Sequence, residues 1–378
     1  MNNKIRSAWV EVDIQKAVNN FEQIKNLVRK SNNVTKICAV VKANSYGMGS
    51  VELSKNYVIS GVDMLAVAVI SEAMELRERI KETEILILGY TPECYFDDAI
   101  NNNITLTIFS YEQAVVLDKI ARKLNKKAKI HIKVETGMNR LGLMPTNENA
   151  EVIKKIYDFP NIFIQGMFTH FVIADGKDKS TTHMQAKEFI RFAKLLEEKG
   201  VDIPIKHAGN SATIIDLPEY YFDMVRPGII LSGFYPSDDV DKSKLKIDPC
   251  ITLKALLSNV KSIPPNSGVS YGHTFKARDK TVVGTIPLGY ADGFSRSLSN
   301  NFYVIVKGKK CLLIGRICMD QFMIDLTNVD NPQVGDEVII YGNGSDGALT
   351  IEDVANIRDT ISYEVESTLS IRLPRKYI

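Results

Sequence analysis

The sequence contains only five cysteines in 378 residues, and no pair of them forms a CxxC arrangement. They are odd in number and scattered along the chain, at Cys38, Cys94, Cys250, Cys311 and Cys318. This pattern does not fit the paired framework of a disulfide-stabilised secreted protein, so we expect a protein of the reducing cytoplasm. The five histidines also lack the HxH and HExxH spacings of metal ligands, and no metal site is predicted.

Long apolar runs and an excess of charge of one sign are missing as well. No apolar run approaches the roughly 20 residues that cross a bilayer, and the segment MNNKIRSAWVEVD lacks the apolar stretch of a secretory signal. The formal net charge is +2, which gives no electrostatic reason to expect nucleic acid or an anionic membrane as a partner. The composition, 45% hydrophobic and 24% charged, is that of a globular protein long enough for two domains.

Strand and helix patterns alternate from residue 13 to about residue 235. Short apolar runs predict strands at 36–41, 64–69, 84–89, 104–109, 129–134, 162–168, 203–208 and 224–234. Segments with helical spacing lie between them, such as QAKEFIRFAKLLEEKG, which ends at the helix-stopping Gly200. Eight such strands predict a (β/α)8 barrel of the TIM type over residues 1–240. A doubly wound open sheet is the alternative, and it is weakened because no GxGxxG opens the first strand-to-helix turn.

The pattern changes after about residue 240. ITLKALLSNVKSI, TVVGTIPLGY, FYVIVKGKKCLLIGRICMDQFMIDLT and DEVIIYG are β-rich and separated by Gly, Pro and Asn. TIEDVANIRD predicts a short helix, and ISYEVESTLSIRL predicts a further strand. We therefore predict a mostly-β domain over residues 241–378, built as a small barrel or sandwich, with the polar SDDVDKSKLK as the linker before it.

Polar side chains follow the predicted barrel strands at the face where such barrels carry their active sites. Lys42 ends the first strand, in ICAVVKANSYGMGS. A lysine there either extends its ammonium into water or holds an amine in a pocket whose desolvation frees the lone pair for carbonyl chemistry. Further polar residues follow later strands: Lys133, Arg140, His170, Asn210, Ser211 and Arg226. Their convergence on one rim favours the second alternative.

Two of these loops suit an anion. GNSAT opens a predicted short helix, whose first N–H groups have no partner within the helix. RPGII contains a glycine that lets the backbone approach a ligand closely. Either both segments are ordinary turns, or they hold a phosphate after strands seven and eight. An amine and a phosphate site on one barrel rim indicate a phosphorylated aldehyde cofactor such as pyridoxal 5′-phosphate.

Nine ordered motifs resemble those of the bacterial alanine racemases. They are AVVKANSYGMG, KVETGMNRLG, THFVIAD, HAGNSAT, VRPGI, VSYGHTF, GYADGFSR, GRICMDQFM and ISYEV, and together they span nearly the whole chain. The resemblance implies a pyridoxal-phosphate enzyme with an N-terminal (β/α)8 barrel and a C-terminal β domain. It also implies a head-to-tail homodimer whose two active sites are shared between the subunits.

The resemblance assigns a role to each matching residue. Lys42 matches the lysine that binds the cofactor covalently, and Tyr271 matches the second catalytic base, supplied by the partner subunit. Arg226 matches the arginine that faces the pyridine nitrogen, with His170 beside it. The positions that match the phosphate contacts are Tyr46, Ser211, Gly228, Ile229 and Tyr363.

Other matches concern the substrate and its path. Arg140 and the backbone of Met319 match contacts to the substrate carboxylate. Lys133 matches a lysine that is often carbamylated in the family and then holds the arginine at the position of Arg140. The residues that match an access channel and its surroundings are Asp175, Tyr290, Arg296, Arg316 and Ile361.

The resemblance implies two-base racemisation of alanine, which supplies D-alanine for peptidoglycan. A serine or broad small-amino-acid racemase, such as the catalytic half of a resistance-type membrane protein, is a close alternative. Tyr363 favours alanine, because a bulky phenol leaves room for a methyl group and crowds a hydroxymethyl group. Alternatives of other classes are a non-catalytic pyridoxal-phosphate carrier, which would lack the β domain and a counterpart of Tyr271, and a cofactor-free Schiff-base aldolase.

Overall fold

The computed structural model describes residues 6–344 and 347–378, and its chain divides into two compact units. The first, which we call the barrel unit, comprises Val18–Ser45 and Ser50–Ile247. The second, which we call the β unit, comprises the N-terminal residues up to Ala17, the short segment Tyr46–Gly49, and Asp248–Ile378. The predicted domain boundary between residues 240 and 241 stays a prediction.

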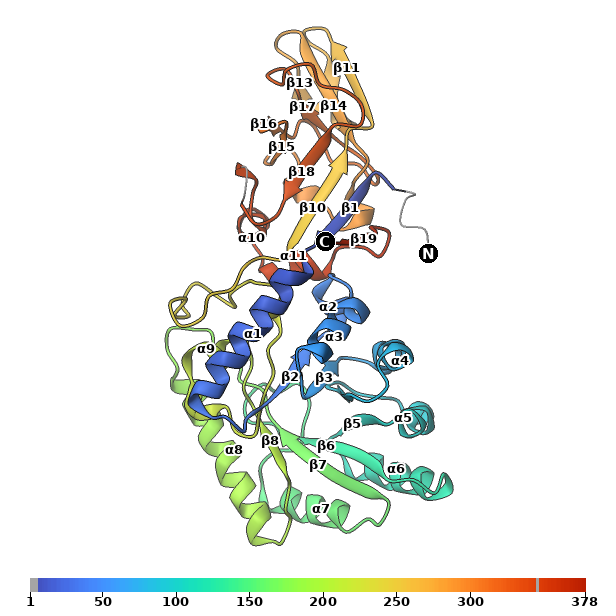
Figure 1. Ribbon diagram of the computed structural model, residues 1–378, viewed down its shortest axis with the longest axis vertical. Coiled ribbons are helices and arrows are strands. Elements are labelled where there is room, and N and C mark those ends of the chain that lie inside the picture. Colours follow the sequence, from blue (N-terminus) through green and yellow to red (C-terminus); the bar gives the residue numbers. More distant parts are fainter. Residues whose placement is uncertain (1–5, 345–346) are drawn as a thin grey trace. The chain divides into compact units, whose positions relative to one another are not determined.

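Eight parallel strands of the barrel unit form one nearly closed sheet, in the order β8-β7-β6-β5-β4-β3-β2-β9 (Figure 1). Its strands are β2 (Lys36–Val40), β3 (Met64–Val67), β4 (Glu84–Ile87), β5 (Ile104–Ile108), β6 (Ala128–Lys133), β7 (Ile162–Phe168), β8 (Ile205–His207) and β9 (Met224–Val225). Two backbone hydrogen bonds link the segments of β8 and β9, from Asp223 N to Lys206 O at 3.0 Å and from Arg226 N to Gly209 O at 2.9 Å. The predicted TIM-type barrel is confirmed.

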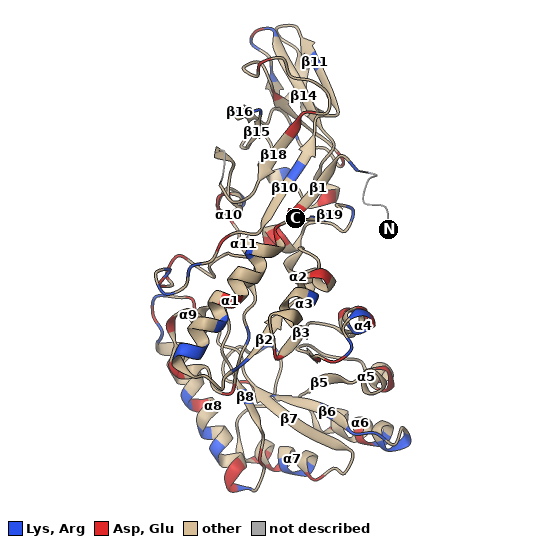
Figure 2. Cartoon of the chain, viewed as in Figure 1, with Lys and Arg blue, Asp and Glu red and all other residues tan. Residues whose placement is uncertain are grey.

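Helices surround this sheet on its outer side (Figure 1). They are α1 (Ile14–Ser31), α3 (Ser50–Ile59), α4 (Ile70–Arg79), α5 (Phe96–Asn101), α6 (Tyr111–Lys123), α7 (Asn147–Tyr157), α8 (Ser180–Glu198) and α9 (Ser211–Asp216). In α8 the buried residues recur at helical spacing, as with Ala186, Phe189 and Ala193, while Lys, Arg and Glu occupy the other face (Figure 2). Burial of one apolar stripe against the sheet is what stabilises such a helix.

Short turns connect some of these elements. They are the left-handed turn α2 (Lys42–Tyr46), whose last residue belongs to the β unit, and the 3-10 turns η1 (Glu93–Tyr95), η2 (Pro218–Tyr220) and η3 (Ile229–Leu231). The predicted strand over 224–234 is wrong beyond Val225. Pro227 has no N–H to donate to a ladder, and the chain turns into η3 after it.

The β unit contains three sheets. The largest has six strands in the order β16-β15-β18-β10-β1-β19, and the others are β11-β14-β17 and the hairpin β12-β13. The strands are β1 (Ala8–Val12), β10 (Ile251–Leu256), β11 (Asn259–Ile263), β12 (Gly268–Val269), β13 (Phe275–Lys276), β14 (Thr281–Ile286), β15 (Tyr303–Val306), β16 (Lys309–Leu312), β17 (Phe322–Asp325), β18 (Glu337–Tyr341) and β19 (Arg375–Tyr377). The predicted mostly-β domain is confirmed.

Two helices and three 3-10 turns complete the described part of the β unit. They are α10 (Ile351–Arg358), α11 (Ser362–Ser367), η4 (Tyr271–His273), η5 (Tyr290–Asp292) and η6 (Arg296–Leu298). The helix predicted from TIEDVANIRD is confirmed as α10, which starts at a capping box of Thr350 and Asp353. The strand predicted from ISYEVESTLSIRL is wrong, because Ser362, Val365, Glu366 and Leu369 are the buried positions and their spacing is helical.

Four strands lie outside the segments predicted to be β. Three of them, β12, β13 and β19, have only two or three residues each, and the fourth is longer. AWVEV forms β1, which pairs antiparallel with β10 and parallel with β19, although it stands far from both in the sequence.

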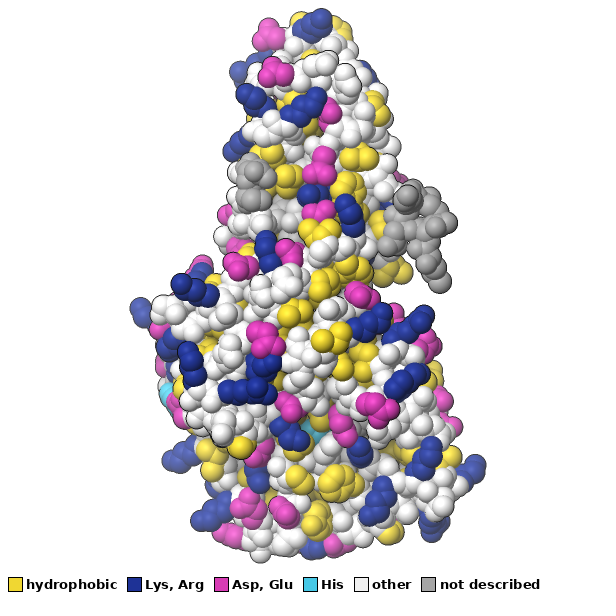
Figure 3. Space-filling view, in the orientation of Figure 1, with side chains coloured by type: hydrophobic (Ala, Val, Ile, Leu, Met, Phe, Trp, Pro, Cys, Tyr) yellow, Lys and Arg dark blue, Asp and Glu magenta, His cyan; other side chains and the backbone are white. Residues whose placement is uncertain are grey.

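On the face shown in Figure 3, basic and acidic side chains are interspersed over the surface. None of the helices in residues 6–344 and 347–378 is long and apolar enough to span a membrane.

Candidate active site

The barrel unit brings its predicted site residues to the carboxyl ends of its strands. Lys42 follows β2, Lys133 is the last residue of β6, and His170 follows β7. Ser211 is the first residue of α9, after β8, and Arg226 comes directly after β9. Because the strands are parallel, these positions share one rim of the barrel. Arg140 and Asp175 lie in the loops after β6 and β7.

The turn that carries Lys42 is left-handed. The φ angles of Ala43, Asn44, Ser45 and Tyr46 are 50°, 55°, 51° and 53°. Such a conformation costs roughly 1–2 kcal/mol for each residue with a side chain. Local hydrogen bonds hold it: Ala43 N donates to the Glu72 carboxylate at 2.6 Å, and Ser50 N donates to Asn44 Oδ1 at 2.9 Å. Strain of this kind is kept where the surroundings impose it, as they do at functional sites.

The Lys42 amine is partly buried among other cations. Its pKa lies below the usual value of 10.5, mainly because burial disfavours the charged form and also because Arg140 and Arg226 repel it. The carboxylate of Glu72 acts in the opposite direction. Within the described parts of the chain, no hydrogen bond or ion pair is formed by the Lys42 amine. The amine is therefore available for a ligand. Because its pKa is lowered, a larger fraction of it is neutral at a given pH than of an ordinary lysine.

Arg226 is a buried cation, only 4% exposed. Its guanidinium donates to His207 Nδ1 at 2.8 Å, to Thr169 O at 2.9 Å and to Ala208 O at 3.0 Å, and it lies 3.3 Å from His170 Nδ1. Burial lowers its pKa to about 10, so it stays protonated at neutral pH. No carboxylate in residues 6–344 or 347–378 forms an ion pair with it. A buried and uncompensated cation favours an anionic or electron-rich ligand.

Three histidines beside Arg226 are held neutral. Burial and the positive charge of Arg226 lower the pKa of His170 to about 3 and that of His207 well below 6.5. Burial likewise lowers the pKa of His131 to about 3. Because a guanidinium can only donate, His207 Nδ1 accepts, and its Nε2–H then donates to His131 Nδ1 at 2.8 Å. Arg226 thus sets the tautomers of a buried hydrogen-bonded series.

Lys133 and Arg140 form the next part of the rim. Lys133 is 4% exposed and donates to Val134 O at 2.6 Å, and burial lowers its pKa to about 8. Glu135 accepts from the backbone N–H groups of Gly137 and Arg140, at 2.5 Å and 3.3 Å, and so shapes the loop that bears Arg140. The Arg140 side chain is exposed. The loop therefore presents a guanidinium to solvent beside a lysine that gives up its proton easily.

The two predicted anion-binding segments of the barrel unit contact each other. Asn210 caps α9 by accepting from Thr213 N at 3.1 Å, and Ser211 Oγ accepts from Gly228 N at 3.0 Å. The first N–H groups of α9 have no partner within the helix. The buried residues Ser211, Gly228 and Ile229 thus lie together, and we call them the anion cradle.

The β unit places its predicted site residues in two groups. In the first, the rings of Tyr46 and Tyr363 lie edge to face, with centroids 6.1 Å apart. Burial, with the nearby Glu366, raises the pKa of Tyr46, so this phenol remains a neutral hydrogen-bond donor. Ile361, which is exposed, precedes α11 on the same segment as Tyr363.

The second group consists of three loops. Ser270 Oγ donates to Arg316 O at 2.6 Å, and the Arg316 guanidinium lies against Gly272. Tyr290 N donates to Cys318 O at 3.2 Å, which brings η5 beside Met319. Tyr271 is 67% exposed and Met319 is 53% exposed. These loops, with Arg296 on η6, present an aromatic and polar surface on which the Tyr271 side chain is exposed.

Sequence reasoning missed several residues that shape the site. His207 and His131 align Arg226, while Glu72 and Glu135 support the loops of Lys42 and Arg140. A histidine within the apolar KIHIKV and IPIKHA was a usable signal, because a polar side chain in a buried strand needs a partner. The two glutamates carried no such signal.

Comparison with known proteins identifies relatives over the whole length. Residues 12–236 match the family profile described as alanine racemase, N-terminal domain, and residues 250–377 match alanine racemase, C-terminal domain. The chain is 46% identical over 370 residues to an alanine racemase of Methanococcus maripaludis, covering 98% of each chain. It is 44% identical to an alanine racemase of Clostridium perfringens, covering 99% of this chain and 96% of the relative. A solved alanine racemase of Clostridium difficile 630, in complex with cycloserine, superposes with a TM-score of 0.93 at 40% identity, covering 99% and 96%.

Proposed function

Because this chain belongs to the alanine racemase family and is an amino-acid racemase, we propose that it interconverts L-alanine and D-alanine with pyridoxal 5′-phosphate and two bases. The observation that carries the proposal is the Lys42 amine. It projects from a strained turn at the barrel rim, has a lowered pKa and is free of partners among the described residues.

The residues on the rim fit this cofactor. Arg140 and Arg226 lower the pKa values of both Lys42 and Lys133, so an anionic ligand would relieve the repulsion among these cations. Ser211, Gly228 and Ile229, with the phenols of Tyr46 and Tyr363, would hold the phosphate. Arg226 would face the pyridine nitrogen with its proton retained, and His170 would support it. When bound, pyridoxal phosphate supplies the electron withdrawal that makes the α-hydrogen of an amino acid acidic.

Two side chains would exchange the α-proton. The Lys42 amine would hold the cofactor covalently in the resting enzyme and, once released, act as the base on one face of the substrate. Tyr271 would act on the opposite face. Because its phenol is exposed on this chain, we propose that Tyr271 serves the site of a partner subunit in a homodimer.

Arg140 and the N–H of Met319 would bind the substrate carboxylate. Carbamylation of Lys133, in which its neutral amine adds to CO2 and releases a proton, would convert a cation into an anion that orients Arg140. The reaction requires a neutral amine, and a pKa of about 8 leaves roughly a tenth of Lys133 neutral at pH 7. Tyr290, Asp175, Arg296, Arg316 and Ile361 would line and surround the access channel.

Tyr363 supports alanine over serine as the substrate. Its ring packs against Tyr46, which restrains the phenol from turning away to admit a hydroxymethyl group. The physiological product would be D-alanine for peptidoglycan, made in the cytoplasm. We also propose that the boundary between catalytic barrel and β domain lies near residue 240, in the segment between the two matched family regions.

A chiral assay of the purified protein with L-alanine and L-serine tests the proposed function. We expect rapid loss of optical activity with L-alanine and a rate lower by about one to two orders of magnitude with L-serine, since one small group changes transition-state binding by about 1–3 kcal/mol. Equal rates would favour the broad-specificity alternative. No turnover of either substrate with added pyridoxal phosphate would refute the proposal.

Lys42→Ala is the matching variant. It should reduce turnover at least about a thousandfold, because both covalent attachment and one proton transfer are lost. In the unaltered protein, cofactor absorbance should remain after gel filtration, and borohydride reduction should make the attachment permanent. Lys42→Ala should lack this absorbance. Lys36→Ala is the control, since Lys36 is an exposed lysine at the other end of the same strand. A Lys42→Ala protein that racemises alanine at the unaltered rate would contradict the assignment.

A further inference from the structure

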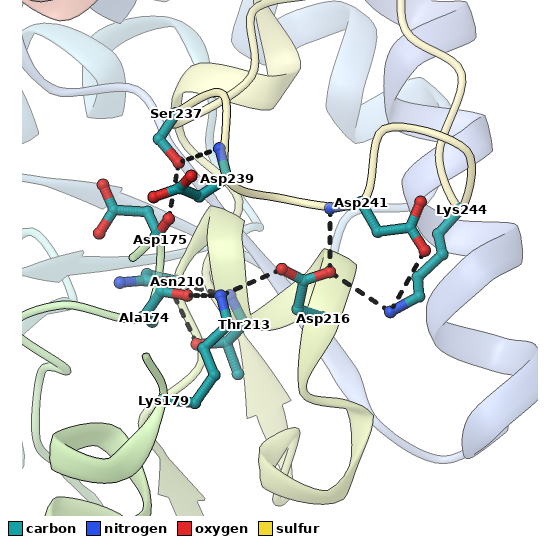
Figure 4. Close-up of polar contacts among 10 residues, drawn as sticks. All are labelled: Ala174, Asp175, Lys179, Asn210, Thr213, Asp216, Ser237, Asp239, Asp241 and Lys244. Atoms are coloured by element: carbon teal, nitrogen blue, oxygen red, sulfur yellow. Dashed lines mark hydrogen bonds and ion pairs between the residues drawn. The ribbon is translucent and has the colours of Figure 1, made fainter. Parts of the chain in front are cut away.

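The carboxylate of Asp216, at the end of α9, holds three groups from two other segments (Figure 4). Lys179 Nζ donates to it at 3.1 Å, Lys244 Nζ at 3.3 Å, and Asp241 N at 3.2 Å. Its side chain is only 9% exposed. Asp216 therefore joins the loop between β7 and α8, the helix α9, and the segment after residue 235.

The position of this carboxylate is unfavourable for the helix itself. The last carbonyl groups of a helix carry partial negative charge, so an acidic residue there is destabilising unless cations neutralise it. Two ammonium groups do so, and they differ in exposure: the Lys179 side chain is 18% exposed and that of Lys244 is 44% exposed. Since solvent screens the more exposed pair, the Lys179–Asp216 pair is the stronger connection.

Lys179 also holds the loop that carries Asp175. Its Nζ donates to Ala174 O at 2.7 Å. The next carbonyl, Asp175 O, accepts from Ser237 Oγ at 2.6 Å, and Ser237 Oγ in turn accepts from Asp239 N at 3.2 Å. Two consecutive carbonyl groups are thus fixed from one side. Figure 4 shows the Asp175 carboxylate directed away from these contacts, which leaves it free to face a ligand.

The opposite end of α9 belongs to the anion cradle. Asn210 Oδ1 accepts from both the N–H and the hydroxyl of Thr213 at 3.1 Å, and Ser211 Oγ accepts from Gly228 N. This helix is only six residues long. Through α9, the contacts of Asp216 therefore connect the Asp175 loop to the cradle around Ser211.

We propose that the Lys179–Asp216 pair is a positioning device that fixes the Asp175 loop relative to the phosphate-binding end of α9. The proposal rests on the proposed function, which makes Asp175 a channel residue and Ser211 a phosphate ligand. Neither Lys179 nor Asp216 contacts the reacting atoms. Their effect is on the geometry through which substrate enters, so loosening the pair raises KM more than it changes kcat.

The test compares Lys179→Met and Asp216→Asn with Lys244→Met, each as the cofactor-loaded enzyme. Lys244 contacts the same carboxylate and has no contact with the loop of Ala174 and Asp175, so it is a matched control. Loss of a partly buried ion pair should raise KM for L-alanine about threefold to tenfold in the first two variants, with kcat within about twofold. Backbone amides of residues 174–178 should exchange with deuterium faster in them, and Lys244→Met should match the unaltered protein in both measurements.

Lys179→Arg separates positioning from general stability. It keeps the charge and can reach both Asp216 and Ala174 O, so it should restore KM and the slow exchange. The proposal is overturned if Lys179→Met matches Lys244→Met in KM and in exchange. It is also overturned if Lys179→Met and Asp216→Asn lower kcat by a similar factor while KM for L-alanine stays unchanged. If the unaltered protein does not racemise alanine, the proposed function fails, whereas the exchange comparison still decides whether the pair holds the loop.

Discussion

The strand ends of the barrel unit and the loops around Tyr271 in the β unit contribute site residues of different character. In the barrel, Lys133 and Arg226 are each 4% exposed, and Lys42 is held in a strained turn. The neighbouring charges and burial have already moved their pKa values. In the β unit, Tyr271 and Met319 are more than half exposed. The barrel residues therefore carry preset chemistry, whereas the side chains of Tyr271 and Met319 lie largely in contact with solvent.

This difference has a physical origin. Parallel strands converge at one rim, so polar side chains at their ends are crowded together and desolvated by one another. The loops of the β unit extend from antiparallel sheets and are held by backbone contacts, such as Ser270 Oγ to Arg316 O, that fix their shape and leave their side chains in water. A phenol with a reference pKa near 10 needs cationic neighbours to serve as a base. Binding of Tyr271 to the rim of a second barrel would provide them.

The largest effect should come from removing one base of each unit. Lys42→Ala and Tyr271→Phe proteins should each be inactive or nearly so, the second by about two to four orders of magnitude. When equal amounts of the two inactive proteins are mixed under conditions that allow subunit exchange, about a quarter of the activity of the unaltered protein should return if sites are shared. About half of the dimers are then mixed, and each mixed dimer has one complete site. Deuterium incorporation by Tyr271→Phe should be suppressed more from one enantiomer than from the other.

Tyr303→Phe is the control in the same unit, because the Tyr303 hydroxyl contacts only Gly347 O among the described residues. It should retain full activity. Absence of any rescue in verified heterodimers of the Lys42→Ala and Tyr271→Phe proteins would contradict the sharing of sites. Equal loss of exchange from both enantiomers would contradict the two-base scheme.

A smaller effect should distinguish the units by their response to acid. His131 and His207 are fully buried and neutral, because burial lowers the pKa of His131 to about 3 and that of His207 well below 6.5. The unfolded chain, with histidine pKa values near 6.5, binds protons first, so the free energy of unfolding falls as pH decreases from about 6.5 towards 3. Each histidine can contribute at most about 1.4 kcal/mol per pH unit. This loss should be visible in urea unfolding monitored by the circular dichroism of the helices at several pH values.

Trp9, the only tryptophan, lies on β1 and reports the β unit. Its fluorescence should show a weaker acid dependence than the helix signal. His131→Asn retains an acceptor for His207. It should reduce the pH dependence of the free energy of unfolding by the equivalent of about one bound proton, while His183→Gln, at an exposed position, should leave this dependence unchanged. Equal acid dependence in His131→Asn and the unaltered protein would show that this histidine does not cause the effect.

The smallest effects should come from the helix caps. Thr350 caps α10 in the β unit, and Asn210 caps α9 in the barrel unit. Replacement of either by Ala should reduce the free energy of unfolding by about 1 kcal/mol. Only Asn210→Ala should also weaken pyridoxal phosphate binding, about fivefold by fluorescence titration, because its helix begins at Ser211. Equal cofactor affinity in both variants would contradict a role of α9 in holding the phosphate.

The sequence was sufficient for much of the fold. The eight barrel strands were predicted because each contains a short, continuous apolar run, and α10 was predicted because its apolar residues recur at helical spacing. The positions of Lys42, Lys133, His170, Ser211 and Arg226 at strand ends were predicted for the same reason. The segment of α11 was misassigned because SYEVES has alternating polarity, and its buried side proved to be the helical one.

Some features required contacts between distant segments. AWVEV joins β10 and β19 across more than 240 residues of sequence, so its pairing leaves no local pattern. The series from Arg226 through His207 to His131 joins the segments of β9, β8 and β6, and the Asp216 contacts join a loop, the helix α9 and the segment after residue 235. None of these pairs is close enough in sequence for spacing alone to predict it.

The sequence by itself determined which chemical groups stand at the strand ends, because strand periodicity and chain direction are local properties. Only the tertiary structure decided what those groups can do. The lowered pKa of Lys42, the buried charge of Arg226 and the neutral histidines arise from desolvation and from charges brought together by folding. Electrostatic interactions depend on distance and burial, and both are created when the barrel closes.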